Sequence, residues 1–484
     1  MSIYLIMIII YFAVLLAMGV IMSKRVKDEK DYFIAKDKLS APVIGFSYSA
    51  TQMSGSTYMS TAGQITVLGY AFIPSALTSA AAPWFSFIIA GDRVRKVANK
   101  ISSITLADIF EARYGKKAGL AVAIVTFIAV IPLITAQLRA GAVAFGVTMN
   151  IPYMTGLFVF GSFVVLYTFL GGMFAVAWSD LIQGVLMTIG LLILVPVVLS
   201  QAGGFTNAHA EFARMNPAGM SMTGTRPALW VISAFFMWGF FQIGGAPSAL
   251  TRFLMTSDEK KLNSALVYSI TFQSFIFLFV ALLGIAGGTL IRGLANPDEL
   301  MAQLILTYLH PVIGGVVLAA ALAAMMSTVD SVLLLASSIF VNNIYVKGMG
   351  KPAKDAAGLR LGRILTIIIG FVGLLFAINP PDAVLWIIAI GFQLMAAAFT
   401  FPFIFGLWWP GTTKIGGIAG IISGFVVCVV WYVWSFVSFG NLSVFIGGIW
   451  PGVIGALVSL VVTIVASLGT PPIDKETAEI FYAD

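Results

Sequence analysis

Long apolar segments recur along the whole chain, separated by shorter polar stretches. Each is close in length to the ~20 residues that an α-helix needs to cross the hydrocarbon core of a bilayer. The pattern predicts an all-α membrane protein with twelve clearly apolar spans, at residues 3–22, 70–90, 118–146, 153–169, 181–200, 228–250, 264–291, 311–340, 361–378, 383–409, 415–437 and 444–468.

The charged residues point to one span more than the apolar segments show. Two stretches, residues 23–41 and 91–117, are rich in Lys and Arg, and basic loops are retained on the cytoplasmic side. Two loops on the same side must be separated by an even number of crossings, yet only the segment 70–90 lies between them. The basic residues of the first loop are Lys24, Arg25, Lys27, Lys30, Lys36 and Lys38.

The missing crossing is predicted at residues 42–61, a stretch too polar to stand out by hydropathy. From Ser47 to Thr61, eight of fifteen residues are Ser or Thr. Backbone that leaves the helix inside a membrane must be buried in protein or line a wet cavity, and hydroxyl groups help to satisfy it. We expect this thirteenth span to be broken near Thr51–Thr57 and to line a site.

With thirteen spans, we expect a protein of a bacterial-type inner membrane whose N-terminus lies outside. Its C-terminal tail, residues 469–484, then lies on the cytoplasmic side. Of the 27 Lys and Arg residues, Arg214, Arg226 and Arg292 then fall outside, Arg139 falls in the membrane, and the rest fall inside. This placement follows the positive-inside rule.

A second break is expected in the span 228–250, at Gly244, Gly245, Ala246 and Pro247, because Pro removes a helix donor and Gly loosens the backbone. The two broken spans lie five crossings apart and run in opposite directions. Interrupted segments at corresponding positions of two halves indicate a transporter with an inverted repeat. Gly and Pro are also simply common in membrane helices.

The predicted architecture is one transmembrane domain over residues 1–484 with a five-plus-five inverted repeat. Its parts are an extra first helix (3–22), a first repeat (42–200), a second repeat (228–409) and two C-terminal helices (415–468).

The span 311–340 carries the clearest candidate for cation binding. Ser327, Asp330 and Ser331 share one helix face at i, i+3 and i+4, with Thr328 beside them. An acid with hydroxyls suits a hard cation that takes oxygen ligands, and sodium is the natural candidate. The alternative is an inert Asp at a hydrated helix end.

Three further sets of residues are candidates with ordinary alternatives. Asp180 opens the span 181–200, where it either caps the helix or relays a cation. Arg139 either meets a substrate carboxylate or extends toward the interface. Trp238, Phe241 and Gln242, just before the second break, either form a wall of a small-molecule pocket or pack in the interior.

These features together resemble the sodium:solute symporter family. The match is carried by Asp31-Tyr32-Phe33 before the polar span and by the stretch from Ile151-Pro152-Tyr153 through Leu166 to Ala175, Trp178, Ser179, Asp180 and Gln183. It departs at Asn150, where relatives often have Gly, and at Pro410-Gly411, where a basic residue is usual. The sequence is most similar to the sodium/pantothenate branch, through Ile151–Gly156, Met325–Thr328 and Pro380-Pro381 leading to Trp386.

The resemblance implies an all-α membrane protein of thirteen helices, ten of them forming the inverted repeat of the LeuT-like fold of amino acid/sodium symporters, with broken helices 1 and 6. It also implies a principal sodium site. Its ligands would be the backbone carbonyls of Ala50, Met53 and Ala324 and the hydroxyls of Ser327 and Thr328. Relatives with a second sodium site use positions that read Asp180, Asp330 and Ser331 here, so a second sodium, a proton or a structural pair stay open. The proline branch carries an acid where this chain has Gln52.

The expected function is a sodium-coupled symporter that imports a small organic carboxylate, pantothenate first, with proline or an acetate- or pyruvate-like monocarboxylate as the alternative. Its partners are the solute, Na⁺ and membrane lipid, without nucleic acid or an obligate protein. A channel is the alternative class. The substrate-binding candidates are Gln52, Ser54, Gly55, Ser56, Thr57, Arg139, Trp238, Phe241 and Gln242.

Overall fold

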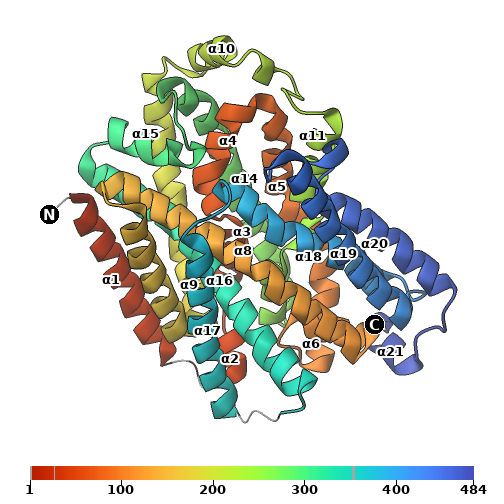
Figure 1. The fold of residues 1–484 in the computed structure, drawn as a ribbon. Coiled ribbons are helices and arrows are strands. Elements are labelled where there is room, and N and C mark those ends of the chain that lie inside the picture. Colours follow the sequence, from red (N-terminus) through yellow and green to blue (C-terminus); the bar gives the residue numbers. More distant parts are fainter. Residues whose placement is uncertain (1–2, 25, 27, 352–354, 484) are drawn as a thin grey trace.

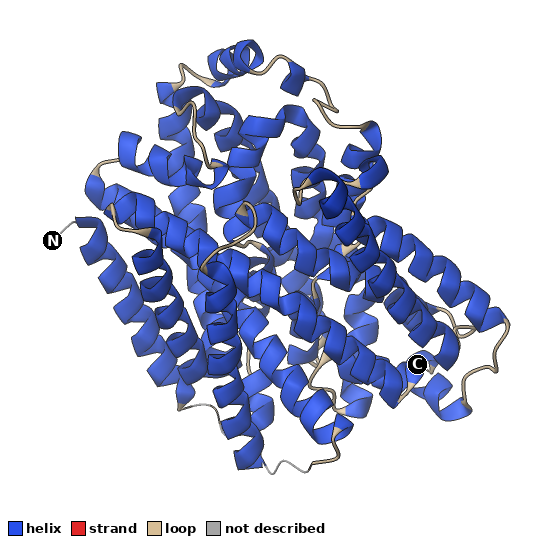
Figure 2. Ribbon diagram, viewed as in Figure 1, coloured by secondary structure: helices blue, strands red, loops and turns tan. Residues whose placement is uncertain are grey.

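The computed structural model describes residues 3–24, 26, 28–351 and 355–483, and the regular elements in this part of the chain are helices (Figures 1 and 2). Ten helical segments among them are long and apolar enough to cross a membrane. Their bounds are Ile3–Ser23 (α1), Ser56–Ile101 (η1 to α6), Lys116–Met149 (α8), Tyr153–Gln201 (α9), Glu259–Leu290 (α14), Pro311–Gly348 (α16 and η7), Ala357–Ala377 (in α17, Asp355–Ala377), Val384–Trp408 (α18), Lys414–Phe439 (α19) and Pro451–Leu468 (α20).

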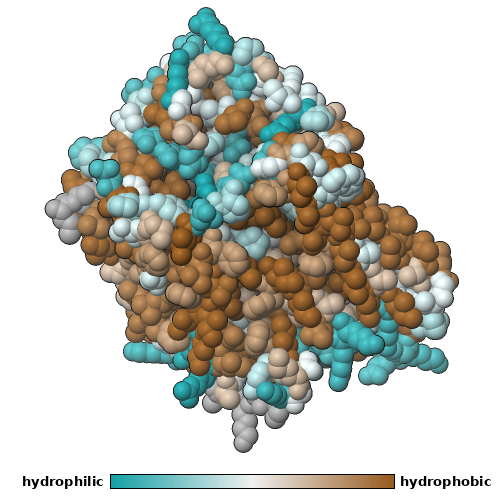
Figure 3. All heavy atoms as spheres, viewed as in Figure 1, coloured by the Kyte–Doolittle hydropathy of each residue, from teal (hydrophilic) through white to brown (hydrophobic). Residues whose placement is uncertain are grey.

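Figure 3 shows an apolar band around the visible face, with hydrophilic residues gathered above and below it. Exposed Ile, Val and Leu side chains supply this band, for example Ile10 and Val14 on α1 and Val461 on α20. By contrast, α16 and α18 are the most enclosed of the long helices. The outer helices therefore present a surface for lipid, while α16 and α18 form the interior that positions the site.

The polar stretch is a broken helix, as predicted. The helix α3 spans Ala41–Gln52. The next residue, Met53, has backbone angles that are not helical (φ −79°, ψ 71°). The chain resumes as a π-helix at Ser56–Ser60 (η1) and continues as α4, Thr61–Leu68. The interruption lies inside the predicted stretch Thr51–Thr57, and the hydroxyl side chains around it are buried.

The second broken segment differs from the prediction in where it breaks. The helix α11 (Ala228–Trp238) ends at Trp238, and Gly239 has non-helical angles (φ −107°, ψ −93°). Two short helices follow, α12 at Gln242–Gly245 and α13 at Pro247–Leu250, and then the 3₁₀ turn η5 at Thr251–Met255. The expected interruption at Gly244–Pro247 is therefore the second of two, because Pro247 cannot donate to the preceding turn while Gly239 has already ended the helix.

The predicted spans 153–169 and 181–200 are joined directly in α9. Gly172 has φ 58° and ψ −165°, which is not helical, and the helix continues on both sides of it. Asp180 therefore lies about two turns inside the second half of α9 and is not at a helix N-terminus. The prediction that Asp180 opens a span was wrong, because the helix restarts directly after the kink.

Both basic stretches lie at the same end of the molecule, as the crossing argument requires (Figure 1). The backbone N–H of Asp37 donates to the carbonyl of Met255 (2.7 Å). Arg95 Nη1 donates to the carbonyl of Ser257, two residues further on (2.6 Å). Arg25 and Lys27 of the first basic stretch lie outside the described residues.

Several stretches predicted as loops contain short helices, and the stretch 91–117 is mostly helical. Hydropathy alone does not separate these amphipathic pieces from loops, because they are too short or too polar to cross a membrane. These helices are α2 (Glu29–Phe33), α6 (Asp92–Ile101), α7 (Leu106–Tyr114), α10 (Phe205–Met215), α15 (Leu300–Tyr308) and α21 (Lys475–Tyr482). The other short elements are η2 (Gly69–Phe72), α5 (Ile73–Ser86), η3 (Phe87–Gly91), η4 (Ala218–Met220), η6 (Pro297–Glu299), η7 (Phe340–Gly348) and η8 (Ile446–Gly448).

The Gly172 kink gives a first prediction about stability. The backbone of Gly172 lies in a region that only glycine adopts readily, and another residue there costs about 1–3 kcal/mol. A Cβ at Gly172 would also lie 2.4 Å from Cδ2 of Tyr32. Gly172→Ala is therefore expected to lower the apparent melting temperature of the purified protein in detergent.

Gly204 is the matched control, because it has similar backbone angles (φ 89°, ψ 169°) and open space where an added Cβ would lie. Gly204→Ala should show the backbone cost alone and so a smaller drop than Gly172→Ala. Equal drops would show that the contact with Tyr32 does not constrain the kink.

Candidate functional site

The hydroxyl face of α16 meets the broken end of α3. Ser327 Oγ donates a hydrogen bond to the carbonyl of Ala50 (2.9 Å), and Thr328 Oγ1 donates to the carbonyl of Thr51 (3.0 Å). Both hydroxyls also lie within hydrogen-bond distance of the carbonyl of Ala324 (3.1 and 3.5 Å). All of these residues are buried.

This meeting follows from the break in α3. The last carbonyls of a helix have no intrahelical partner, and inside a membrane they need another donor or a cation. Four expected ligands therefore come together, with the Thr51 carbonyl beside them: the Ala50 and Ala324 carbonyls and the Ser327 and Thr328 hydroxyls. Met53, the remaining predicted ligand, directly follows α3. Such a set of uncharged oxygens around a helix break can hold an alkali cation.

A second polar cluster surrounds Asp180. Ser47 Oγ donates to Asp180 Oδ2 (2.6 Å), and Arg252 Nη2 donates to the same oxygen (3.2 Å) and to Ser331 Oγ (2.6 Å). The Ser331 hydroxyl also lies 2.9 Å from Thr51 Oγ1. The side chains of Asp180 and Arg252 are both fully buried. The cluster therefore links α3, α9, η5 and α16 through one ion pair.

Arg252 was missed by the sequence analysis, which counted it with the cytoplasmic basic residues. Its place in the sequence holds a signal: it follows the Gly- and Pro-rich break by five residues and has apolar neighbours on its C-terminal side, Phe253 to Met255. A lone basic residue beside a broken helix indicates a buried charge with a partner.

Asp330 lies on the same helix as Ser331 but has a different partner. Thr168 Oγ1, from the first half of α9, donates to Asp330 Oδ1 (2.5 Å). Asp330 Oδ2 has no hydrogen-bond donor among the described residues, and its side chain is fully buried. The three residues predicted for a second cation site therefore have different partners. Ser331 and Asp180 accept hydrogen bonds from Arg252, whereas Asp330 accepts one from Thr168.

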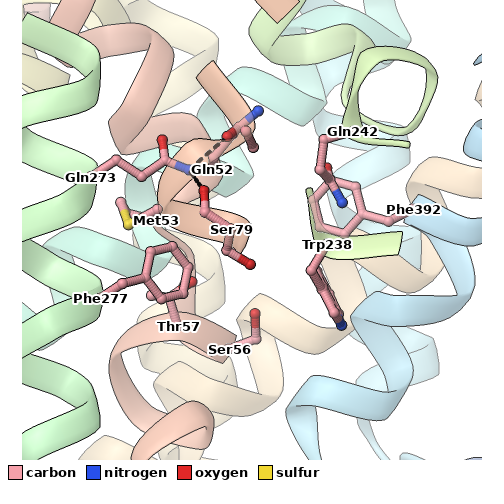
Figure 4. Close-up of a pocket in the computed structure, with 11 residues that line it drawn as sticks. Gln52, Met53, Ser56, Thr57, Ser79, Trp238, Gln242, Gln273, Phe277 and Phe392 are labelled. Atoms are coloured by element: carbon pink, nitrogen blue, oxygen red, sulfur yellow. Dashed lines mark hydrogen bonds between the residues drawn. The ribbon is translucent and has the colours of Figure 1, made fainter. Parts of the chain in front are cut away.

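A small pocket opens next to the break in α3 (Figure 4). Its cavity is about 30 Å³, room for one or two water molecules, so it must widen to admit a solute. The side chains of Gln52 and Gln273 meet on one wall, and Trp238, Gln242 and Phe392 form the opposite one. The lining residues are Gln52, Met53, Ser56, Thr57, Ser79, Ala82, Trp238, Gln242, Gln273, Phe277 and Phe392.

The lining combines polar side chains with apolar and aromatic ones, and none of these residues carries a formal charge. Gln273 Nε2 donates to Gln52 Oε1 (3.0 Å) and to the carbonyl of Ser79 (2.6 Å). Gln273 Oε1 and Trp238 Nε1 are buried without a hydrogen-bond partner among the described residues. These two atoms are enclosed, whereas the amide and hydroxyl side chains of the lining suit a ligand with amide or hydroxyl groups.

Some predicted substrate residues lie elsewhere. Ser54 Oγ lies 2.7 Å from Ser56 Oγ, and the backbone N–H of Gly55 donates to Gln137 Oε1 (2.7 Å). Phe241 packs against Phe401. Ser54, Gly55 and Phe241 do not line the described pocket, whereas Ser79, Gln273, Phe277 and Phe392 do and were not predicted.

Arg139 borders a different cavity of about 520 Å³, together with Tyr153, Asn296 and Glu299. Its Nε lies 3.7 Å from Oδ2 of Asp298. Asp298 is buried, and it accepts a hydrogen bond from the backbone N–H of Val384, the first residue of α18 (3.0 Å). The pair therefore joins α8, η6 and α18.

Comparison with known proteins defines the class of this transporter. The sequence profile of the sodium:solute symporter family matches residues 32–424. The chain belongs to the sodium:solute symporter family, and it is therefore a sodium-dependent membrane transporter and not an enzyme.

Particular relatives fall into two substrate groups. A sodium/pantothenate symporter of Haemophilus influenzae is 27% identical over 411 residues, covering 83% of this chain and 84% of the relative. A sodium/proline symporter of Staphylococcus aureus is 27% identical over 476 residues, covering 96% and 92%. The fold is similar to that of a Na⁺-coupled sialic acid symporter in a substrate-bound outward-open state, with a TM-score of 0.82, 19% identity and coverage of 98% and 99%.

The Asp298 contact gives a prediction about pH. Burial raises the pKa of Asp298 above its ordinary value, against the opposing effects of its hydrogen bonds and of Arg139. The folded protein then holds a proton that the unfolded chain releases, so this group's contribution to stability falls as pH rises from the ordinary Asp pKa toward the raised one.

Asp298→Asn removes that titration and keeps an acceptor for Val384. The melting temperature of the wild type minus that of the variant should therefore decrease as pH rises above about 4, the ordinary pKa of an aspartic acid. A difference that stays constant above that pH would show that Asp298 keeps its ordinary pKa.

Proposed function

We propose that this sodium-coupled symporter binds its sodium ion between the end of α3 and the hydroxyl face of α16. The ligands are the carbonyls of Ala50, Met53 and Ala324 and the hydroxyls of Ser327 and Thr328. The observation that carries the proposal is the pair of hydrogen bonds from Ser327 and Thr328 to the carbonyls of Ala50 and Thr51. These groups already face one another, so an ion needs only the hydroxyl hydrogens to turn away.

Sodium binding would be linked to the solute through the break itself. Met53 would supply one of the carbonyls that hold the ion, and Gln52 and Met53 also line the pocket. An ion that fixes α3 against α16 therefore orders one wall of the pocket before the loaded repeat rocks to the other side. We place both events in a fold of thirteen helices with a five-plus-five inverted repeat, the N-terminus outside and the C-terminus in the cytoplasm.

One ion supplies enough energy for concentrative import. At about 100 mV, one charge contributes about 2.3 kcal/mol. A tenfold sodium gradient adds about 1.4 kcal/mol, so a solute without net charge, such as proline, can accumulate several hundredfold. A carboxylate anion carried with one sodium ion moves no net charge, so its accumulation relies on the sodium gradient alone and is about tenfold.

For the solute we propose a small organic carboxylate, with pantothenate as the first candidate. Pantothenate carries an amide and hydroxyl groups, which match the glutamine, serine and threonine side chains that line the pocket. Proline is the second candidate, because the curated relatives include sodium/proline symporters. Its ammonium group would meet no carboxylate among the described lining residues. For Arg139 we propose a role at the cavity of about 520 Å³ that it borders. Its positive charge can attract a carboxylate solute before the solute enters the transporter.

The sodium site predicts the effect of removing one hydroxyl. Ser327→Ala is expected to raise the sodium concentration for half-maximal uptake about tenfold, the effect of losing about 1.4 kcal/mol of binding. Ser337→Ala is the control on the same helix, because its buried hydroxyl bonds the carbonyl of Leu333 and contacts Thr366. An unchanged sodium dependence of Ser327→Ala would contradict the ligand assignment.

The solute is tested by uptake of labelled pantothenate, proline, pyruvate and acetate into sealed vesicles, with and without a sodium gradient. We expect pantothenate to accumulate against its gradient only with sodium, and the others to accumulate less. Gln52→Asp should abolish pantothenate accumulation, because a carboxylate in the neutral pocket repels the solute, and Gln52→Asn should retain most of it. Flux that only equilibrates pantothenate would favour a channel, and accumulation of another solute alone would replace the candidate.

A further inference from the structure

Three charged side chains are completely buried beside the proposed sodium site: Asp180, Arg252 and Asp330. Arg252 is held on every side by hydrogen bonds. Its Nη1 donates to the carbonyl of Ser248 (2.6 Å) and to Thr251 Oγ1 (3.3 Å), and its Nε donates to Ser47 Oγ (3.0 Å). Its Nη2 donates to Asp180 and Ser331, as described above. The guanidinium is thus a fixed part of the cluster.

We propose that the guanidinium of Arg252 occupies the place of a second cation, so that the protein binds one sodium ion per chain. The proposal rests on the sodium site proposed above and concerns its stoichiometry. It resolves what Asp180 and Ser331 do, which their residue types alone leave open.

The hydrogen bonds of Arg252 occupy the oxygens that a second cation would need. A second cation held by Asp180 and Ser331 would need Oδ2 of the acid and Oγ of the serine. Both of these oxygens already accept from a single nitrogen, Nη2 of Arg252. A guanidinium does not give up its proton inside a protein, so its N–H groups stay directed at these oxygens and exclude a metal ion from the same place.

The sum of the buried charges also disfavours a second cation. The buried ion pair of Asp180 and Arg252 sums to zero, and Asp330 adds at most one negative charge, with the uncharged Thr168 as its partner in the described part of the chain. Asp330 lies one helical turn from Ser327 on the same face of α16. With Asp330 ionised, one sodium ion at the proposed site makes the buried group neutral. A second ion would leave a net positive charge in a medium where uncompensated charge is costly.

The remaining place for a second ion is the pair of carboxylate oxygens that lack donors among the described residues, Asp180 Oδ1 and Asp330 Oδ2. A second ion there would depend on Asp180, and this dependence makes the two arrangements distinguishable.

The test is equilibrium binding of ²²Na⁺ to the purified full-length protein, which needs no knowledge of the solute. We expect one ion per chain in the wild type and none in Ser327→Ala/Thr328→Ala. Asp180→Asn should still bind one ion, with lower affinity because a negative charge is gone. Arg252→Gln should bind two, because Asp180, Ser331 and Ser47 are then free for a metal ion.

Two controls separate charge from folding. Arg252→Lys keeps a cation in place and should bind one ion, and Arg252→Gln/Asp180→Asn should return to one. Two ions in the wild type, reduced to one by Asp180→Asn, would overturn the proposal even if Arg252→Gln does not fold. No bound ion in the wild type would overturn it together with the sodium site. Failure of pantothenate to accumulate, with one ion still bound, would leave it standing and reject only the solute.

Discussion

A helix that breaks inside a membrane leaves backbone carbonyls without partners, and this constraint organises the centre of the molecule. At the end of α3 these carbonyls are met by the hydroxyls of Ser327 and Thr328 on α16. The enclosure of α16 within the fold follows from the same need, because the polar face it presents must be kept from lipid. The pocket lies next to the same break, so the ion and the solute share one interrupted helix.

The buried charges obey a related constraint. Asp180 and Arg252 lie on segments far apart in sequence and are held together between α3 and α16. Removing either partner would leave an uncompensated charge, which is costly in the interior. The pair therefore ties η5, directly after the second broken segment, to the helices that frame the first one.

Several parts of the fold and of the candidate site could be predicted from local features of the sequence. The polar span could be predicted because counting crossings between the basic stretches required it, and its hydroxyls identified where it breaks. Ser327 was found because helical spacing places it on one face with Asp330 and Ser331. The assignment of Ser327 and its neighbour Thr328 as sodium ligands came from the resemblance to the family. Arg252, Gln273 and Phe392 were not found, because a single polar or aromatic residue in an apolar segment has no periodic signature. Their partners come from helices whose packing the sequence does not specify. The early break at Gly239 was missed because Pro247 is the stronger local signal.

The central claim is that sodium lies between the carbonyl end of α3 and the hydroxyls of α16. Its most direct test is a high-resolution structure of the protein in sodium compared with one in choline. The account predicts density within ligand distance of the Ala50 carbonyl, Ser327 Oγ and Thr328 Oγ1 in sodium, absent in choline. Sodium-dependent density between Asp180 and Asp330, with the Ser327 and Thr328 hydroxyls still bonded to α3, would contradict it.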